Sequence, residues 1–271
     1  MHYRRLKIMA LTCLFAWLLS GLCVQAGSTG LKSVRILSGW QNQDGTYITA
    51  LELILEKGWK TYWRSPGETG LPPYISFSRS RNLKTIRIIW PSPVVFGPKE
   101  MWSVGYKDRL ILPLRITPKD RAAPVTLTLD AMVGICENIC VPAEFTLSQE
   151  LQAGVKKRHP RIVAALVNRP KSAAEAAVES IDCEFSLSHD EMSVEIKLSL
   201  PHVGKRETVM IEYEQPGHWV RLSSSDRTGQ ILVARAKINR SSGPIVSIER
   251  SKVRITVVST NKSVDIGTCS K

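Results

Sequence analysis

Catalytic motifs are scarce in this sequence. It has five histidines in 271 residues, and none has a serine or aspartate partner in a recognisable motif. The G-x-S-x-G, P-loop and G-x-G-x-x-G patterns are absent, which argues against a triad hydrolase and against nucleotide binding through such loops. We expect surface or structural roles for the histidines after residue 26, which are His159, His189, His202 and His218.

Long apolar segments are also absent after residue 26. No run of about 18 apolar residues follows, so we expect no transmembrane helix there. The apolar run at residues 8–19 is too short to span a membrane, and a basic stretch precedes it. Small residues ending at Ala26 resemble a cleavage site. We therefore predict that residues 1–26 are a cleaved signal peptide and that the protein is exported.

Acidic residues are the minority charge, with 24 Asp and Glu against 37 Lys and Arg, a formal net charge of +13. The first 26 residues contribute three of these positive charges and no acid, which leaves +10 for the rest. Apart from residues 156–158 the basic residues are scattered, without a stripe interleaved with aromatic residues. We predict no nucleic-acid partner. An acidic partner or an anionic membrane surface is an alternative, but we interpret the charge as favouring solubility.

Alternating apolar and polar residues dominate the chain after the leader. Residues 47–55 and 125–131 each place apolar side chains on one face of a predicted strand. Glycine- and proline-rich turns separate these strands from further candidates at 34–37, 74–78, 85–90, 110–116 and 145–151. This pattern predicts an all-β antiparallel sandwich over residues 27–154. The aromatic residues Trp59, Tyr62 and Trp63 are interpreted as core residues, with a partner groove as the alternative.

The alternation stops over residues 155–180. Pro160 suits the first position of a helix, and Ser172-Ala-Ala-Glu175 is a capping-box pattern before an alanine-rich stretch. We predict a helical connector over 155–180. Alternation then returns, which predicts a second, smaller β-sandwich-like domain over residues 181–271; its candidate strands lie at 194–200, 209–213, 230–238 and 253–258.

Only four cysteines follow the leader, and their spacing is uneven: Cys136, Cys140, Cys183 and Cys269. An even number in an exported protein indicates disulfides, and the spacing favours the pairs 136–140 and 183–269. The second pair would tie together the two ends of the second domain as a structural disulfide. We expect no metal site, because only two ligands cluster and no histidine has suitable spacing, and no cofactor.

Cys136 and Cys140 enclose only three residues. A disulfide over so short a loop adds little stability, which favours reversible thiol–disulfide exchange, but spacing alone leaves an inert hairpin disulfide equally open. No basic residue adjoins the pair in the sequence, and the spacing is not the C-x-x-C of thioredoxin-type proteins. Because Glu137 lies next to Cys136, we expect Cys140 to have the lower thiol pKa.

Three segments together resemble a known family. Residues 134–144, with the sequence GICENICVPAE, resemble the active-site segment of the N-terminal periplasmic domain of DsbD-type and ScsB-type thiol:disulfide interchange proteins. Residues 58–72 resemble the family's tryptophan-rich loop, and residues 106–113 resemble the strand before the cysteine strand. The resemblance covers about residues 30–150. The connector and the second domain resemble the longer ScsB-type periplasmic region.

The resemblance implies an immunoglobulin-like domain that carries electrons in the periplasm. Cys136 and Cys140 would be its redox pair, and Phe96-Gly97 would match the aromatic tip of a loop that caps the pair. The alternative for Phe96 is a simple core residue. The implied partners are a membrane-embedded thiol electron relay, as a separate chain, and oxidised periplasmic thioredoxin-like or disulfide isomerase proteins.

The sequence departs from the DsbD type in two respects. Its cysteines are separated by fewer residues, and the chain lacks the membrane relay and any thioredoxin-like domain, so electrons must come from another protein. We therefore predict a thiol–disulfide oxidoreductase of the protein-disulfide reductase kind. The alternative is a non-catalytic immunoglobulin-like binding module with an inert disulfide.

Overall fold

The structure is a computed structural model that describes residues 30–67, 69–98, 102–188, 191–243 and 247–269. The predicted signal peptide, residues 1–26, lies outside the described residues. Within the described ranges, no helix has the length and apolar character needed to cross a membrane. Nearly all of the regular structure is antiparallel β-sheet, which confirms the all-β prediction.

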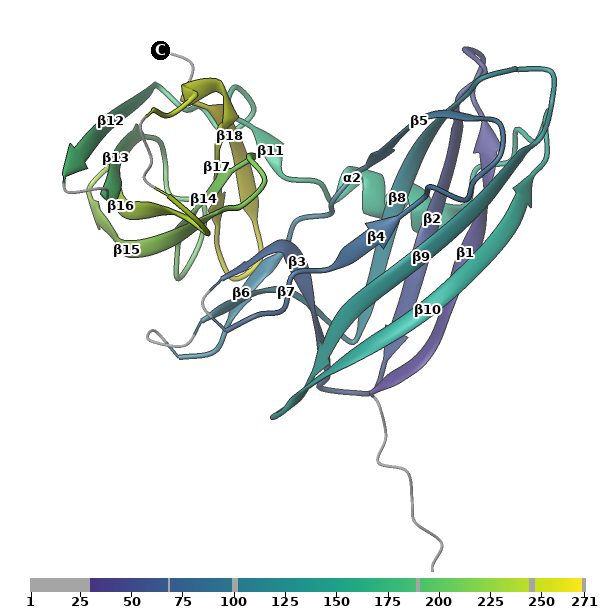
Figure 1. Cartoon of the computed structure of the whole chain (residues 1–271), viewed down its shortest axis with the longest axis horizontal. Helices are drawn as coiled ribbons and strands as arrows, with labels where there is room; N and C mark the ends of the chain where they lie inside the picture. Colours follow the sequence, from purple (N-terminus) through teal and green to yellow (C-terminus); the bar gives the residue numbers. More distant parts are fainter. Residues whose placement is uncertain (1–29, 68, 99–101, 189–190, 244–246, 270–271) are drawn as a thin grey trace, which may run out of the picture.

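Residues 30–151 form two sheets packed face to face, called here the first sandwich (Figure 1). In spatial order, the four-stranded sheet contains β1 (Leu31–Gln41), β2 (Tyr47–Leu55), β8 (Arg109–Pro118) and β5 (Leu83–Ile88). The other sheet contains β10 (Cys140–Leu151), β9 (Val125–Cys136), β3 (Lys60–Gly67), β7 (Ser103–Lys107) and β6 (Val94–Phe96), and β4 (Tyr74–Ser76) pairs with β9.

The core of the first sandwich lies between these sheets. Alternate residues of β9 point inward, and Val125, Leu127 and Leu129 are fully buried. Leu112 and Leu114 of β8 meet them from the opposite sheet. Burying each such side chain contributes about 1.5–3 kcal/mol relative to exposure, so this core holds the sheets in the positions that present the cysteine pair.

The cysteine pair lies at one end of the longest hairpin. Strands β9 and β10 pair without a register shift from Val125–Leu151 to Cys136–Cys140. At the cysteine end, β3 lies on the other side of β9 and places Lys60 opposite Cys136. The hairpin therefore brings the two cysteines together as the last cross-strand pair before the loop.

The predicted helical connector is only partly helical. Helix α2 (Pro160–Val167) has Pro160 at its start and buries Ile162 against Trp40. The Ser172–Glu175 capping box forms, with Ser172 N–H donating to Glu175 Oε2 at 2.8 Å, yet it encloses a single turn. The prediction of a helix there was wrong: Ala177 has a φ of +52°, which ends the turn before the next strand begins.

Helix α2 is fixed to the first sandwich by a buried carboxylate. Glu52 is buried, and Arg161 Nη1 donates to its Oε1 at 2.6 Å while Arg35 Nε donates to its Oε2 at 2.8 Å. Burial opposes ionisation, but the hydrogen bonds from the two arginines outweigh it and hold the pKa of Glu52 below its usual value. Glu52 is therefore ionised at neutral pH and anchors the start of the connector.

The rest of the chain forms a second sandwich, residues 171–269, made of two four-stranded sheets (Figure 1). One contains β12 (Ser180–Ser188), β13 (Glu191–Ser199), β16 (Ile231–Arg240) and β15 (His218–Thr228). The other contains β11 (Lys171–Ser172), β18 (Ser263–Thr268), β17 (Val253–Val258) and β14 (Thr208–Tyr213), with a short 3-10 helix η2 (Arg250–Lys252) before β17. A disulfide joins Cys183 to Cys269 across this sandwich.

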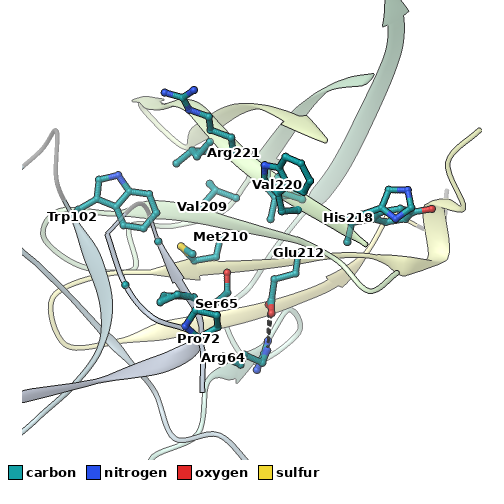
Figure 2. A pocket seen from close by; sticks show the side chains of 17 residues that line it. Arg64, Ser65, Pro72, Trp102, Val209, Met210, Glu212, His218, Val220 and Arg221 are labelled. Carbon is teal, nitrogen blue, oxygen red and sulfur yellow. Dashed lines mark hydrogen bonds and ion pairs between the residues drawn. The ribbon is translucent and has the colours of Figure 1, made fainter. Parts of the chain in front are cut away.

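The two sandwiches touch through separate contacts. Arg64 forms a bidentate ion pair with Glu212, with both N–O distances at 2.9 Å. Met210 and Val258 of the second sandwich are buried against the core of the first. Between these contacts lies a cavity of about 540 Å³, with Trp102 among its lining residues (Figure 2). The interface is therefore not continuously packed.

Candidate functional site

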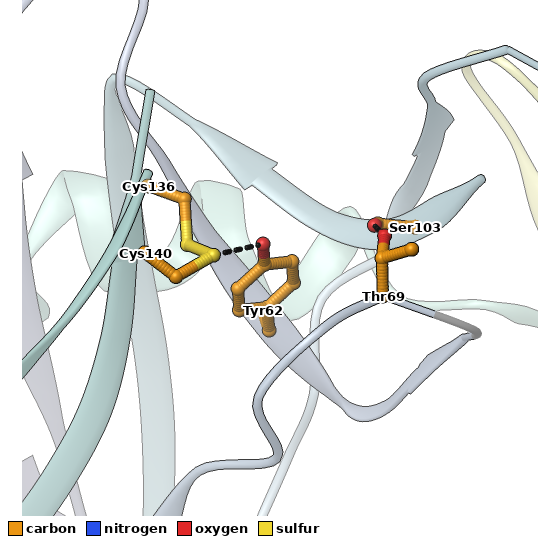
Figure 3. The surroundings of a disulfide bond; sticks show 5 residues. All are labelled: Tyr62, Thr69, Ser103, Cys136 and Cys140. Atoms are coloured by element: carbon orange, nitrogen blue, oxygen red, sulfur yellow. Dashed lines mark hydrogen bonds between the residues drawn. A yellow bond between two sulfur atoms is a disulfide. The ribbon is translucent and has the colours of Figure 1, made fainter. Parts of the chain in front are cut away.

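The disulfide between Cys136 and Cys140 is the centre of the site (Figure 3). The two Cα atoms are 4.2 Å apart, and the intervening residues 137–139 are exposed. Cys136 is 3% exposed, whereas Cys140 is exposed to solvent. Of the two cysteines, Cys140 is therefore the one that a partner can reach.

Tyr62 contacts the sulfur of Cys140. Its hydroxyl lies 3.0 Å from Cys140 Sγ (Figure 3). Because a disulfide sulfur carries no hydrogen, the tyrosine is the donor. Burial raises the pKa of Tyr62, and Ser103 only partly offsets this, so the hydroxyl keeps its proton at neutral pH. After reduction, the same hydrogen bond would favour the thiolate form of Cys140.

The backbone near Tyr62 is fitted closely around the pair. A Cβ atom added to Gly134 would come within 2.9 Å of Leu71 Cβ and 3.0 Å of Tyr62 Cδ2. Glycine is thus required there for the Tyr62 ring to reach the hairpin. The loop that carries Leu71 is held to β7 by a 2.7 Å hydrogen bond between the Thr69 and Ser103 hydroxyls.

Phe96 lies in the same buried cluster as Cys136. It is 6% exposed and packs in a small cluster with Tyr62 and Cys136, separate from the main core. Its ring centroid lies 6.3 Å from that of Tyr62. The next residue, Gly97, has a φ of +92°, a conformation that favours glycine. This position is compatible with the predicted cap.

Two lysines bring positive charge to the cluster. Lys60 Nζ lies 5.3 Å from the centroid of the Phe96 ring, and Lys107 Nζ lies 5.9 Å from it. Lys60 is also the cross-strand neighbour of Cys136. No basic residue adjoins the cysteines in the sequence, but the fold therefore brings two lysines to their cluster.

The tryptophans and histidines considered in the sequence analysis lie outside this cluster. Trp63 is fully buried in the main core, Trp59 packs against it, and of these three aromatic residues only Tyr62 reaches the disulfide. His159 and His218 are far apart in the chain and belong to different elements. Among the described residues, no three His, Cys, Asp or Glu side chains gather as metal ligands. His189 lies outside the described residues.

Sequence reasoning missed Tyr62 and Lys60 as site residues. Tyr62 is 78 positions from Cys140, and only the pairing of β3 with β9 brings the two segments together. The signal available was indirect: both residues belong to the tryptophan-rich segment 58–72, one of the three segments that carry the family resemblance. That resemblance places the segment near the site but does not identify which side chain faces the sulfur.

The fold and the site together define a class, a β-sandwich with a cysteine pair at the loop end of its longest hairpin. The sequence profile of the family described as "Thiol:disulfide interchange protein DsbD, N-terminal" matches residues 33–152. These residues, fewer than half of the chain, include the three segments on which the resemblance drawn from the sequence rests, and the match supports that resemblance.

A solved structure supports the same fold. The crystal structure of the N-terminal periplasmic domain of ScsB from Proteus mirabilis superposes with a TM-score of 0.63 at 18% identity, covering 89% of this chain and 98% of that chain. The match confirms the immunoglobulin-like sandwich and extends over both sandwiches. No curated protein matches the chain in a sequence comparison.

The exposure of the two cysteines predicts unequal reactivity. In the reduced protein, iodoacetamide should label Cys140 at least about tenfold faster than Cys136, because Cys140 is exposed and its thiolate accepts the Tyr62 hydrogen bond. Mass spectrometry of timed samples measures both rates. Tyr62→Phe removes only the hydroxyl and should slow the labelling of Cys140 by roughly tenfold. Faster labelling of Cys136 would reverse the assignment.

Proposed function

We propose that this protein is a periplasmic thiol:disulfide interchange protein that passes reducing equivalents to oxidised proteins through Cys136 and Cys140. The observation that carries the proposal is the asymmetric pair, in which Cys140 is an exposed residue whose sulfur accepts a hydrogen bond from Tyr62, while Cys136 is buried. The match of residues 33–152 to a thiol:disulfide interchange family supports it. The periplasmic location rests on the predicted signal peptide and on the periplasmic origin of the ScsB domain.

The proposed reaction transfers two electrons. The thiolate of reduced Cys140 attacks one sulfur of the partner's disulfide, forms a mixed disulfide and releases the other partner sulfur as a thiolate, which takes up a proton. The Cys136 thiol loses its proton, and its thiolate attacks Cys140 Sγ. This step forms the Cys136–Cys140 disulfide and releases the second partner thiolate. The partner ends as a dithiol and this protein as a disulfide.

Regeneration needs a second thiol protein. The dithiol of a membrane-embedded electron relay, as a separate chain, would reduce the Cys136–Cys140 disulfide by the same two steps in reverse. The acceptors would be oxidised thioredoxin-like or disulfide isomerase proteins. The exposed Ile139 beside Cys140, 78% exposed, gives such a partner an apolar contact next to the reacting sulfur.

A redox titration tests the proposal. The Cys136–Cys140 couple should have a reduction potential above about −300 mV, the level below which structural disulfides usually lie. The titration is read by mass after alkylation in dithiol buffers of graded potential, and Cys183–Cys269 in the same sample is the internal comparison. A potential well below that level, together with failure to form any mixed disulfide, would support the inert binding module instead.

The cap is tested by Phe96→Ala. If Phe96 shields the pair, the variant should be oxidised by a small disulfide several-fold faster than the wild type, with a stability loss below the about 3–5 kcal/mol typical of truncating a core phenylalanine. Stopped-flow oxidation and thermal unfolding measure the two quantities.

The matched control is Phe145→Ala, on strand β10 of the hairpin that carries the cysteines but packed against the main core. It should lower stability without speeding oxidation. A collapse of the melting temperature in Phe96→Ala with an unchanged oxidation rate would instead make Phe96 a core residue.

A further inference from the structure

The short strand that carries Phe96 is held by the second half of the chain. Strand β6 is the edge strand of its sheet, with β7 on one side only. On the other side, Val95 N–H donates to the carbonyl of Ser259 at 3.3 Å. Ser259 belongs to the turn between β17 and β18 of the second sandwich. The edge of β6 that faces away from β7 is therefore hydrogen-bonded at one point to the other sandwich.

Both ends of the same segment have further contacts of this kind. Beyond Phe96, Arg206 Nη2 donates to the carbonyl of Gly97 at 2.5 Å. Before β6, Ser92 N–H donates to the carbonyl of Asn168, at the end of helix α2, at 2.6 Å. Three hydrogen bonds from the connector and the second sandwich thus hold residues 92–97.

The turn that makes the bond to Val95 is itself fixed. Ser259 is fully buried, and its hydroxyl donates to the Lys262 carbonyl at 2.9 Å and accepts from Lys262 N–H at 3.1 Å, which closes the turn. Arg206 has a φ of +53°, which is uncommon for a residue other than glycine, and it is exposed to solvent where it reaches Gly97. The second sandwich therefore offers a preformed surface to β6.

Apolar packing and hydrogen bonds both make this contact, because Val95 lies in the same buried cluster as Met210 and Val258. A cavity of about 310 Å³ lies beside β6, and its lining includes Val95, Trp102, Arg206 and Thr208. Where a cavity separates two surfaces, the dispersion contacts across it are lost. Beside this cavity the polar contacts, Arg206 to Gly97 among them, contribute to how firmly the segment is held.

We infer that the second sandwich positions the cap: Arg206 and the Ser259 turn hold residues 94–97 so that the Phe96 ring stays over Cys136. The inference rests on the proposed function, since it concerns access to the same cysteine pair. It gives the second sandwich a role in exchange, as a positioning element that touches neither sulfur. A partner that displaces Arg206 from Gly97 would loosen the cap.

The test compares oxidation rates of reduced full-length variants with hydroxyethyl disulfide, a neutral reagent. Arg206→Ala should be oxidised about fivefold faster than the wild type, which is the change in rate that corresponds to one net hydrogen bond. Arg206→Lys should bring the rate most of the way back to the wild-type value. Two controls should stay within about twofold of the wild type. Lys205→Ala removes the neighbouring positive charge, and Glu212→Gln weakens the interface at a place that does not touch β6.

A double-mutant cycle shows whether the effect passes through the cap. In a Phe96→Ala background, adding Arg206→Ala should have no further effect on the rate, because the group being positioned is gone. An unchanged or slower rate in Arg206→Ala, an equal acceleration in either control, or an equal acceleration in the Phe96→Ala background would each overturn the inference.

Hydrogen exchange separates this inference from the proposed function. Amide protection at residues 94–97 should fall in Arg206→Ala and persist in Lys205→Ala, whether or not the cysteines react. If the wild-type pair exchanges with no disulfide at all, the proposed function fails, while this measurement still decides whether the second sandwich holds the segment. Unchanged protection in Arg206→Ala would overturn the anchor itself.

Discussion

Cys140→Ser should abolish reduction of an oxidised partner, with a loss of at least about a thousandfold in rate, and should form no mixed disulfide. The reason is access: Cys136, the remaining thiol, is 3% exposed and lies behind Phe96. Cys136→Ser should behave differently. Its exposed Cys140 still attacks, but no second thiol resolves the product, so a mixed disulfide through Cys140 should accumulate. Non-reducing electrophoresis and peptide mapping with an oxidised thioredoxin-like protein distinguish the two results.

Both variants should remain folded, because the hairpin continues in register well beyond the cysteines. Circular dichroism and melting temperature check this. A Cys140→Ser protein that readily forms a mixed disulfide through Cys136 would contradict the assignment of the attacking thiol. If neither variant forms one, while oxidised partners are reduced by other thiol proteins in the same assay, the exchange function itself is contradicted.

Removal of the other disulfide should mainly affect stability. Cys183 and Cys269 are 86 positions apart and both are buried in the core of the second sandwich. The chain-entropy relation gives about 4–5 kcal/mol for a loop of this length, against about 2 kcal/mol for the short Cys136–Cys140 loop. The double variant Cys183→Ala, Cys269→Ala should therefore lower the melting temperature of the second sandwich by roughly 15–30 °C.

Calorimetry of the full chain measures this loss, with Cys136→Ala, Cys140→Ala as the matched control of smaller expected effect. Exchange at Cys136–Cys140 should survive the first double variant at temperatures where the second sandwich is folded. A disulfide-linked peptide joining Cys136 or Cys140 to Cys183 or Cys269 would contradict both the structural bond and the redox pair. A melting temperature within a few degrees of the wild type would contradict the structural role.

Much of the fold follows from local patterns. The alternation at residues 47–55 and 125–131 predicted β2 and most of β9, because a strand with one buried face needs a period of two. Strands β6 and β7 were not among the predicted strands. In the case of β6, the segment Val94–Phe96 is too short to show any period. The helix predicted after Ser172 failed because the capping box forms in a lone turn as readily as at a helix start.

The candidate site, like the fold, could be predicted from the sequence only where the pattern is local. The spacing of Cys136 and Cys140 singles out the pair because a five-residue segment contains both ends of the contact. Tyr62, Lys60 and the Arg206–Gly97 contact depend on sheet order and on how the two sandwiches meet, and neither follows from residue periodicity. Local chemistry therefore identifies the sulfurs, and tertiary structure supplies what surrounds them.

The unshifted ladder of the β9–β10 hairpin has a consequence for repeated use of the protein. The disulfide joins the last pair of the ladder, and the pairs from Ile135–Val141 to Val125–Leu151 hold the strands together without it. Opening the sulfur–sulfur bond therefore frees only the three-residue loop between the cysteines. Oxidised and reduced forms should have nearly the same shape, so a partner must distinguish them at the sulfur atoms themselves, and each cycle of reduction and oxidation needs little rearrangement of the chain.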